Sequence, residues 1–122
     1  MSGRVPADVV EPGAALILIT VKTKVKPGSA DAYLEAMRSF LEATRQEPGN
    51  KWYEHFRSVD DPDTILTLEA FDDAAAGEAH VASEHFQRFL EHDESKPLVA
   101  QVPDIIYVDL PDRDGWDKMA EF

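Results

Sequence analysis

The segment EAHVASEHF, residues 78–86, holds two of the four histidines of this 122-residue chain. Imidazole suits both acid–base catalysis near neutral pH and metal binding. A five-residue separation on one helix corresponds to about 140° of rotation, so the rings of His80 and His85 are expected to diverge. Helical zinc pairs use four-residue spacing, as in H-E-x-x-H, which the chain lacks. Ser83 can cap a new helix and change this angle, but no third ligand is evident, so we assign no metal site.

His80 fits two roles. As a general base it would remove a proton from a bound ligand. As a structural residue it would lie half-buried against a sheet and hydrogen-bond to it, which is the commoner role of such histidines. The residues alone favour the structural role. His85 is expected to pack beside Phe89 at the edge of its helix.

Two acidic residues, Glu54 and Glu69, fall on adjacent strands of a predicted hairpin. They could share a proton or hold His80 in one tautomer, or each could pair with a basic residue on a hydrated face. We favour the paired interpretation for Glu54, and both stay open for Glu69. Four aromatic residues are expected mostly in the core, and some of them would line the pocket if a planar substrate binds there: Trp52, Tyr53, Phe71 and Phe86.

The hydrophobic pattern predicts the elements that would position these residues. They are, in chain order, a strand at 15–25, a helix from 30 to about 46, strands at 51–59 and 64–71, helices at 74–82 and 84–93, and a strand at 104–110. Pro48 and Gly49 end the first helix, and Asp72 or Asp73 caps the second. This β-α-β-β-α(α)-β order predicts an α+β fold of the ferredoxin-like split βαβ type, with helices on one face of an antiparallel four-stranded sheet.

We expect one folded domain over residues 14–110, with tails at 1–13 and 111–122. Helices on one side leave the other sheet face, with residues such as Leu66 and Leu68, in need of a cover. A second copy of the chain would supply it, so we predict a homodimer. Apolar residues recur every third position in the C-terminal tail, which is expected to pack on its own subunit or on the partner.

Acidic residues outnumber basic ones by 24 to 12, for a formal net charge of −12. This charge repels nucleic acids and anionic lipids, so neither is expected as a partner. The chain has no cysteine, which excludes disulfides, thiolate nucleophiles and cysteine-ligated metal centres. Its longest apolar run, residues 14–21, is too short to span a bilayer, and the N-terminal residues do not fit a secretory signal. A cytoplasmic location is therefore expected, without membrane association.

The chain contains, in this order, the segments VKTKVKPGSADAYL, EATRQEPGNKWYE and LTLEAFDDAAAGEAHVASEHFQRF. Together, over about residues 16–108, they resemble the antibiotic biosynthesis monooxygenase family. The resemblance implies a homodimeric α+β barrel with a pocket between each sheet and its helices. Studied members oxygenate quinols and polyketide-derived phenols without metal or flavin. A branch degrades haem, and other members are isomerases or have no known activity.

The haem-degrading branch uses an asparagine on the first strand, a tryptophan on the second helix and a histidine ten residues later. The corresponding positions here hold Val21, His80 and Leu90, and a leucine cannot ligate iron. Haem degradation is therefore disfavoured. In that branch the position of His80 faces the pocket, which strengthens the case for a functional role. The third-strand aromatic residue, commonly tryptophan in the family, is Phe71 here, which changes the expected pocket width.

The resemblance thus implies a monooxygenase that oxidises an electron-rich aromatic, such as a quinol, an anthrone or a polyketide-like phenol, with O₂ and no cofactor. His80 is its expected base. The expected substrate contacts are Val21, Trp52, Tyr53, Glu69, Phe71 and Phe86. Two alternatives stay open. One is an isomerase that uses the same pocket without O₂, and the other is a non-catalytic, stress-associated dimer that binds a small molecule.

Overall fold

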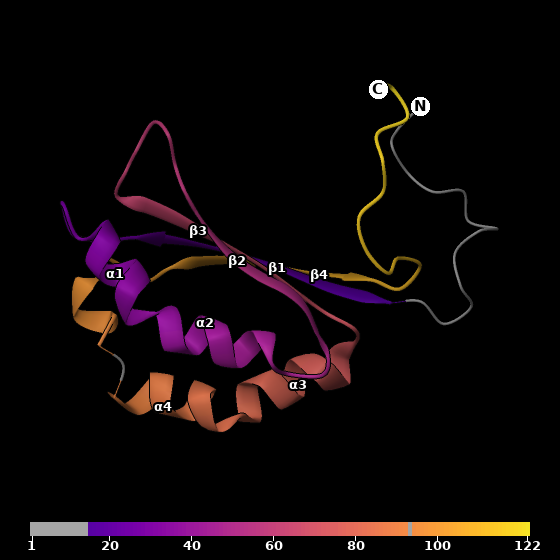
Figure 1. Cartoon of the computed structure of the whole chain (residues 1–122), viewed down its shortest axis with the longest axis horizontal. Coiled ribbons are helices and arrows are strands. Elements are labelled where there is room, and N and C mark those ends of the chain that lie inside the picture. The colour runs from indigo at the N-terminus through magenta and orange to yellow at the C-terminus, as the bar shows by residue number, and fades with distance from the viewer. Residues whose placement is uncertain (1–14, 93) are drawn as a thin grey trace.

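A four-stranded antiparallel sheet carries the helices on one of its faces (Figure 1). The computed structural model describes residues 15–92 and 94–122, so the predicted tail at 1–13 lies outside the described residues. The elements are β1 (Leu16–Lys24), α1 (Ala30–Ala36), α2 (Arg38–Arg45), β2 (Asn50–Arg57), β3 (Thr64–Phe71), α3 (Ala74–Ala82), α4 (Glu84–His92), the 3₁₀ turn η2 (Lys96–Leu98) and β4 (Asp104–Leu110). The strands lie in the order β2-β3-β1-β4, and each neighbouring pair is antiparallel. The predicted ferredoxin-like α+β fold is confirmed.

The central strand β1 separates the two faces of the sheet by alternation. It pairs with β3 on one side and with β4 on the other, so Val21 lies opposite both Thr67 and Ile105. Thr23, on the same face as Val21, is only 1% exposed. Lys22 takes the other face and is exposed. The alternation predicted for this strand is therefore correct, and it directs every second side chain toward the helices.

The helix predicted from residue 30 to about 46 is divided at Met37 into α1 and α2. Met37 has φ −86° and ψ −2°, which distorts one turn. Backbone hydrogen bonds from Met37 N to Tyr33 O and from Leu41 N to Met37 O still cross the division, so the two helices run on almost as one. Their inner face buries Tyr33, Met37 and Phe40 in the core. Burial of each such side chain contributes roughly 1.5–3 kcal/mol to stability.

A second break separates α3 from α4 at Ser83, whose ψ of 155° is extended rather than helical. The Ser83 hydroxyl donates to His80 O at 2.6 Å and accepts from Phe86 N at 3.2 Å. It therefore ends one helix and caps the next, which confirms the predicted kink. Because of this break the rings of His80 and His85 approach each other, with centroids 5.9 Å apart.

The turn after α2, residues 47–49, is pressed against the start of α3. A Cβ on Gly49 would lie 2.3 Å from Ala76 Cβ, so only glycine fits at this close approach. Gly49 O also accepts from Asp72 N at 2.9 Å. Asp73 caps α3 by accepting from Ala76 N at 2.8 Å, as one of the two predicted caps. These contacts hold the turn, and with it Glu47, beside the α3–α4 pair.

The sheet face away from the helices is largely apolar. Register places Leu68, Thr20 and Ile106 side by side across β3, β1 and β4, and Ile106 is 64% exposed. The C-terminal segment extends past the end of β4 (Figure 1). Its Trp116 ring lies 5.2 Å from the ring of Trp52 on β2, so this segment contacts its own subunit.

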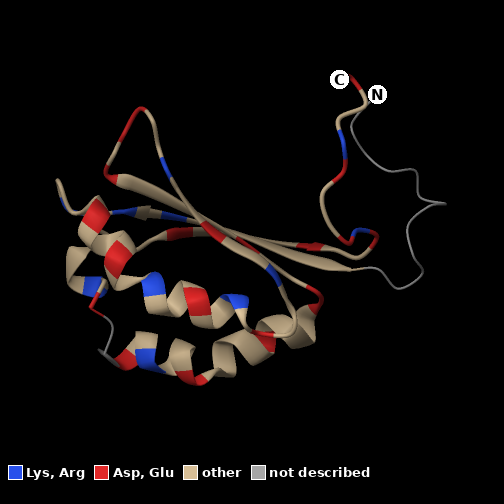
Figure 2. Cartoon of the chain, viewed as in Figure 1, with Lys and Arg blue, Asp and Glu red and all other residues tan. Residues whose placement is uncertain are grey.

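Acidic and basic residues are interspersed along α2 and α4 (Figure 2). Ion pairs such as Glu35–Arg38 and Glu84–Arg88 join neighbouring turns of the helices. Exposed pairs of this kind contribute little to stability, so the helices are held mainly by their buried faces. In the part of the chain that the structure describes, no helix is long and apolar enough to cross a membrane.

Candidate active site

A cavity of about 990 Å³ lies between the sheet and the helices. Its walls are mostly apolar, with Val21 and Tyr107 contributed by the strands and Phe40 and Phe86 by the helices. A space of this size can bury a ligand of several rings. Apolar walls also exclude water, which strengthens the electrostatic interactions of any polar group among them.

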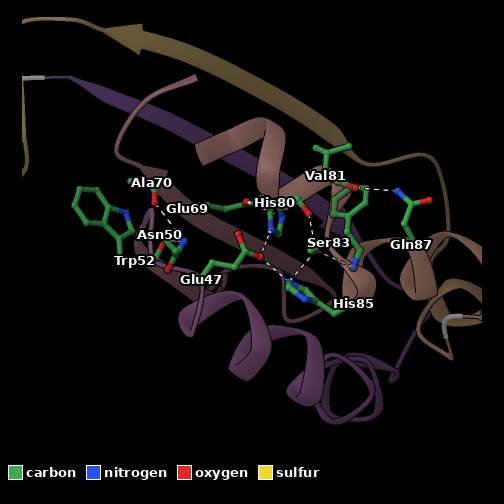
Figure 3. A network of polar contacts seen from close by, with 11 residues as sticks. Glu47, Asn50, Trp52, Glu69, Ala70, His80, Val81, Ser83, His85 and Gln87 are labelled. Carbon is green, nitrogen blue, oxygen red and sulfur yellow. Dashed lines mark hydrogen bonds and ion pairs between the residues drawn. The ribbon is translucent and has the colours of Figure 1, made fainter. Parts of the chain in front are cut away.

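The polar part of the cavity wall centres on His80, which is 5% exposed (Figure 3). His80 Nδ1 lies 2.7 Å from Glu47 Oε2. The same carboxylate oxygen lies 2.6 Å from His85 Nε2. Figure 3 shows the Glu47 carboxylate between the two imidazoles, so a residue from the turn after α2 links α3 to α4.

The other ring nitrogen of His80, Nε2, faces a second carboxyl group, that of Glu69. His80 Nε2 and Glu69 Oε1 are 3.9 Å apart, and both residues line the cavity. Glu69 comes from the helix-facing side of β3, and Figure 3 shows its side chain directed at the His80 ring. The imidazole therefore lies between two carboxyl groups, one outside the cavity lining and one within it.

Burial raises the pKa of Glu69 to about 7, and the negative charge of Glu47 adds to the rise. Glu69 is only 7% exposed, which is why its charged form is disfavoured. A carboxyl group that titrates near neutral pH can both give up and accept a proton under physiological conditions. Perturbed carboxyl groups inside cavities are typical of catalytic sites.

Aromatic rings surround the His80 imidazole. Its centroid lies 4.9 Å from that of Phe71, 5.1 Å from that of Phe86 and 5.7 Å from that of Phe40. Phe71 is fully buried and supports the imidazole without lining the cavity. These contacts restrict rotation of the imidazole and keep its Nδ1 directed at Glu47.

Glu47, His80 and His85 are also the donor types that bind divalent transition metals. One donor atom from each lies within 4.8 Å of the others. However, Glu47 Oε2 is at hydrogen-bonding distance from both nitrogens, so each of these nitrogens already has a partner. The chain thus supplies the third donor that was not evident from the sequence, and the absence of a metal stays a prediction.

The family model for antibiotic biosynthesis monooxygenase matches residues 16–92, which run from β1 to the end of α4. The chain belongs to the antibiotic biosynthesis monooxygenase family. It is 30% identical over 95 residues to the Bacillus subtilis (strain 168) protein named "Putative monooxygenase YcnE", across 78% of this chain and 98% of that relative.

Solved structures of other proteins share the fold of this chain. PA3566 from Pseudomonas aeruginosa is 29% identical, with a TM-score of 0.64 over 78% of this chain and 92% of its own. A Nitrosomonas europaea protein named "Putative antibiotic biosynthesis monooxygenase" has a TM-score of 0.73 over 84% of this chain and 96% of its own. It is 24% identical, so this second likeness bears on the fold alone.

Within this antibiotic biosynthesis monooxygenase fold, the predicted site residues fall into two groups. Those that line the cavity are His80, Val21, Tyr53, Glu69 and Phe86. Trp52 and Phe71 do not line it. Trp52 follows the opposite alternation to the buried Tyr53, and its ring packs on Trp116 at the other face of the sheet. Phe71 packs behind His80 instead.

Two expectations about the histidines were wrong. The rings of His80 and His85 converge rather than diverge, because the extended residue Ser83 reorients α4 relative to α3. His85 is not simply an edge residue, since it bonds Glu47 and its ring lies 5.4 Å from that of Phe40. Sequence reasoning also missed Glu47. The one available signal was its position directly before the Pro–Gly turn of the segment EATRQEPGN.

The remaining histidine with a described side chain is His55, on the helix-facing side of β2. Burial, and secondarily the positive charge of Arg45, lowers the pKa of His55 to about 4. Its ring packs 5.4 Å from that of Tyr53 and does not line the cavity. A neutral imidazole outside the cavity does not compete with His80 as a base for a bound ligand.

Proposed function

We propose that this protein is a monooxygenase that oxidises an electron-rich aromatic compound, such as a quinol, an anthrone or a polyketide-like phenol, with O₂ and without metal or flavin. The supporting observation is the buried His80 imidazole on the wall of a large apolar cavity, bonded to Glu47 through one nitrogen and facing Glu69 with the other. The family of the chain and the name of its Bacillus subtilis relative agree with this class of reaction.

The reaction begins with proton removal. His80 accepts the phenolic or enolic proton through Nε2, the nitrogen on the side of Glu69. The anion that remains is electron-rich and reacts with O₂ directly. The protein orients the substrate and keeps water away from the anion, and the apolar walls formed by residues such as Val21 and Phe86 serve this purpose.

The atoms and electrons of this oxygenation balance without an external reductant. In an anthrone, the CH₂ carbon binds one oxygen atom and becomes a carbonyl. The two hydrogen atoms leave with the second oxygen atom as water. Glu69 can carry a proton near neutral pH, because its pKa is about 7. It lies beside His80, 3.9 Å from Nε2, and would give its proton to the departing oxygen atom.

An isomerase is the second candidate, and a specific observation favours it. His80 and Glu69 are two groups, 3.9 Å apart on one cavity wall, that could remove a proton at one carbon and return it at another. Such a reaction needs no O₂. Oxygen dependence therefore separates the two candidates.

Oxygen uptake tests the proposal. The full chain, treated with a chelator, is mixed with a panel of reduced naphthoquinones and anthrones, and uptake is compared with the rate of autoxidation without protein. We expect uptake with the wild type and its loss in His80→Ala, while Glu84→Ala, an exposed change on α4, behaves as wild type. Uptake that persists in His80→Ala would exclude this base. Turnover of a substrate in the absence of O₂ would favour the isomerase.

A further inference from the structure

We propose that Glu47 is a positioning residue that holds His80 with its proton on Nδ1, so that Nε2 remains free to accept a proton from the cavity. The tautomer is inferred from the contacts of Glu47 with the two histidines and from the chemistry of a carboxylate, without reference to the reaction. The consequence for catalysis rests on the proposed function, in which His80 is the base. Nothing in the sequence pattern assigned a role to Glu47.

The direction of the two hydrogen bonds fixes the tautomers. A carboxylate oxygen only accepts hydrogen bonds. Glu47 Oε2 lies 2.7 Å from His80 Nδ1 and 2.6 Å from His85 Nε2, so both nitrogens must be the donors. A neutral imidazole carries one N–H, so the neutral form of His80 that donates to Glu47 has no hydrogen on Nε2. That nitrogen is the one 3.9 Å from Glu69.

The carboxylate is itself held from several sides. His85 fixes its position through the second hydrogen bond, and the Ser83 hydroxyl lies 3.2 Å from the same His85 nitrogen. The close approach of Gly49 to Ala76 keeps the turn that carries Glu47 against α3. A carboxylate held in this way preserves the orientation of the imidazole, as the aspartate does in serine-protease triads.

The surroundings of Glu47 also indicate a role beyond packing. Its side chain is 14% exposed, and its second oxygen, Oε1, is buried without a hydrogen-bond partner among the described residues. Leaving a buried carboxylate oxygen unbonded costs free energy. The negative charge becomes useful when His80 takes up a proton, because it then stabilises the imidazolium that forms.

The tautomer can be measured without any substrate. Long-range ¹H–¹⁵N NMR spectra of the ¹⁵N-labelled full chain distinguish an Nδ1–H imidazole from an Nε2–H imidazole. We expect the His80 signals of the wild type to report Nδ1–H. In Glu47→Gln the side-chain amide can donate to Nδ1, so we expect a population of the Nε2–H tautomer. A wild type with its proton on Nε2 would overturn the proposal, whether or not any variant folds.

Kinetics test the consequence for the reaction. With a substrate identified by oxygen uptake, we expect Glu47→Gln to lower kcat by at least about 10- to 100-fold, the loss seen when the group that orients a metal-ligating histidine is removed, and to leave KM nearly unchanged. His85→Gln keeps the bond between Glu47 and His80 and should retain the Nδ1–H signal with a smaller loss of kcat. Glu84→Gln, an exposed substitution on the same helix as His85, should alter neither the Nδ1–H signal of His80 nor kcat.

The two claims fail separately. A Glu47→Gln protein with an unchanged tautomer and an unchanged kcat would refute the positioning role while leaving the oxygenase intact. If no compound in the panel supports oxygen uptake, the proposed function fails, but the NMR spectra still decide whether Glu47 sets the tautomer. A rise in KM alone, with the tautomer kept, would make Glu47 a structural residue and overturn the proposal.

Discussion

At the scale of single residues, the proposed acid–base chemistry rests on Glu69 and His80. Their facing atoms are 3.9 Å apart in surroundings that exclude most water. The two carboxyl groups near His80 have different surroundings. Glu47 bonds the imidazole from outside the cavity lining, while Glu69 lines the cavity and titrates near neutral pH. We therefore propose that these two glutamates have different functions, orientation for Glu47 and proton transfer for Glu69, because their neighbours differ.

The raised pKa of Glu69 predicts a pH-dependent stability. The pKa of Glu69 is about 7 in the folded chain, whereas in the unfolded chain this carboxyl group has its ordinary pKa of 4.5. The stabilisation of the fold by protonated Glu69 is therefore fully present below about pH 4.5 and is lost as the pH rises through about 7. Relative to Glu69→Gln, the wild type should lose on the order of 3 kcal/mol of unfolding free energy across this window. Urea unfolding at several pH values measures it, and parallel pH curves for the two proteins would refute the assignment.

Chelation tests whether the Glu47–His80–His85 cluster works as a hydrogen-bonded group or as a metal site. Because Glu47 Oε2 already bonds both nitrogens, we expect prolonged dialysis against EDTA to leave oxygen uptake unchanged. Metal analysis of the dialysed protein serves as the control. Activity that disappears on dialysis and returns with one divalent ion would assign a metal to these three donors.

At the scale of elements, the breaks in the helices position the site residues as much as the helices do. Ser83 turns α4 so that His85 meets Glu47, and Gly49 lets the preceding turn approach α3. The sequence predicted the order of the elements, a helix cap at Asp72 or Asp73 and the break at Ser83, because alternation, capping and helix-ending residues act locally. It could not predict the convergence of the rings. That depends on the angle across an extended residue and on how closely a turn far away in the chain packs against α3.

Two glycines give opposite predictions for stability. Gly49→Ala would place a Cβ 2.3 Å from Ala76 Cβ, so we expect a loss of about 1–3 kcal/mol, as for other overpacked sites. Gly77→Ala meets nothing within 4 Å on α3, and there we expect a gain of about 0.5–1 kcal/mol from helix propensity. Chemical denaturation measures both. Equal effects of the two substitutions would contradict the close packing of residues 47–49 against α3.

At the scale of the whole molecule, the fold has one face covered by helices and one that is not (Figure 1). The uncovered face presents Leu68, Thr20 and Ile106 as a row across three strands. The contact of Trp116 with Trp52 covers only part of β2. We therefore retain the predicted homodimer as a proposal, with this face as its interface.

Sedimentation tests the dimer. The wild type should sediment as a dimer at micromolar concentration, and Ile106→Lys, which places a charge in the middle of the uncovered face, should shift it toward the monomer. Glu84→Lys, an exposed substitution on α4 away from this face, changes the charge without touching the proposed interface and serves as the control. A monomeric wild type would contradict this interface.

The most direct test of the oxygenase is the source of the oxygen atom in the product. A compound that supports oxygen uptake is converted under ¹⁸O₂ in ordinary water, and the product is examined by mass spectrometry. The account predicts one ¹⁸O atom in the product of the wild type and no enzyme-dependent product with His80→Ala. A product that forms without the label, or that forms equally well without O₂, would contradict it.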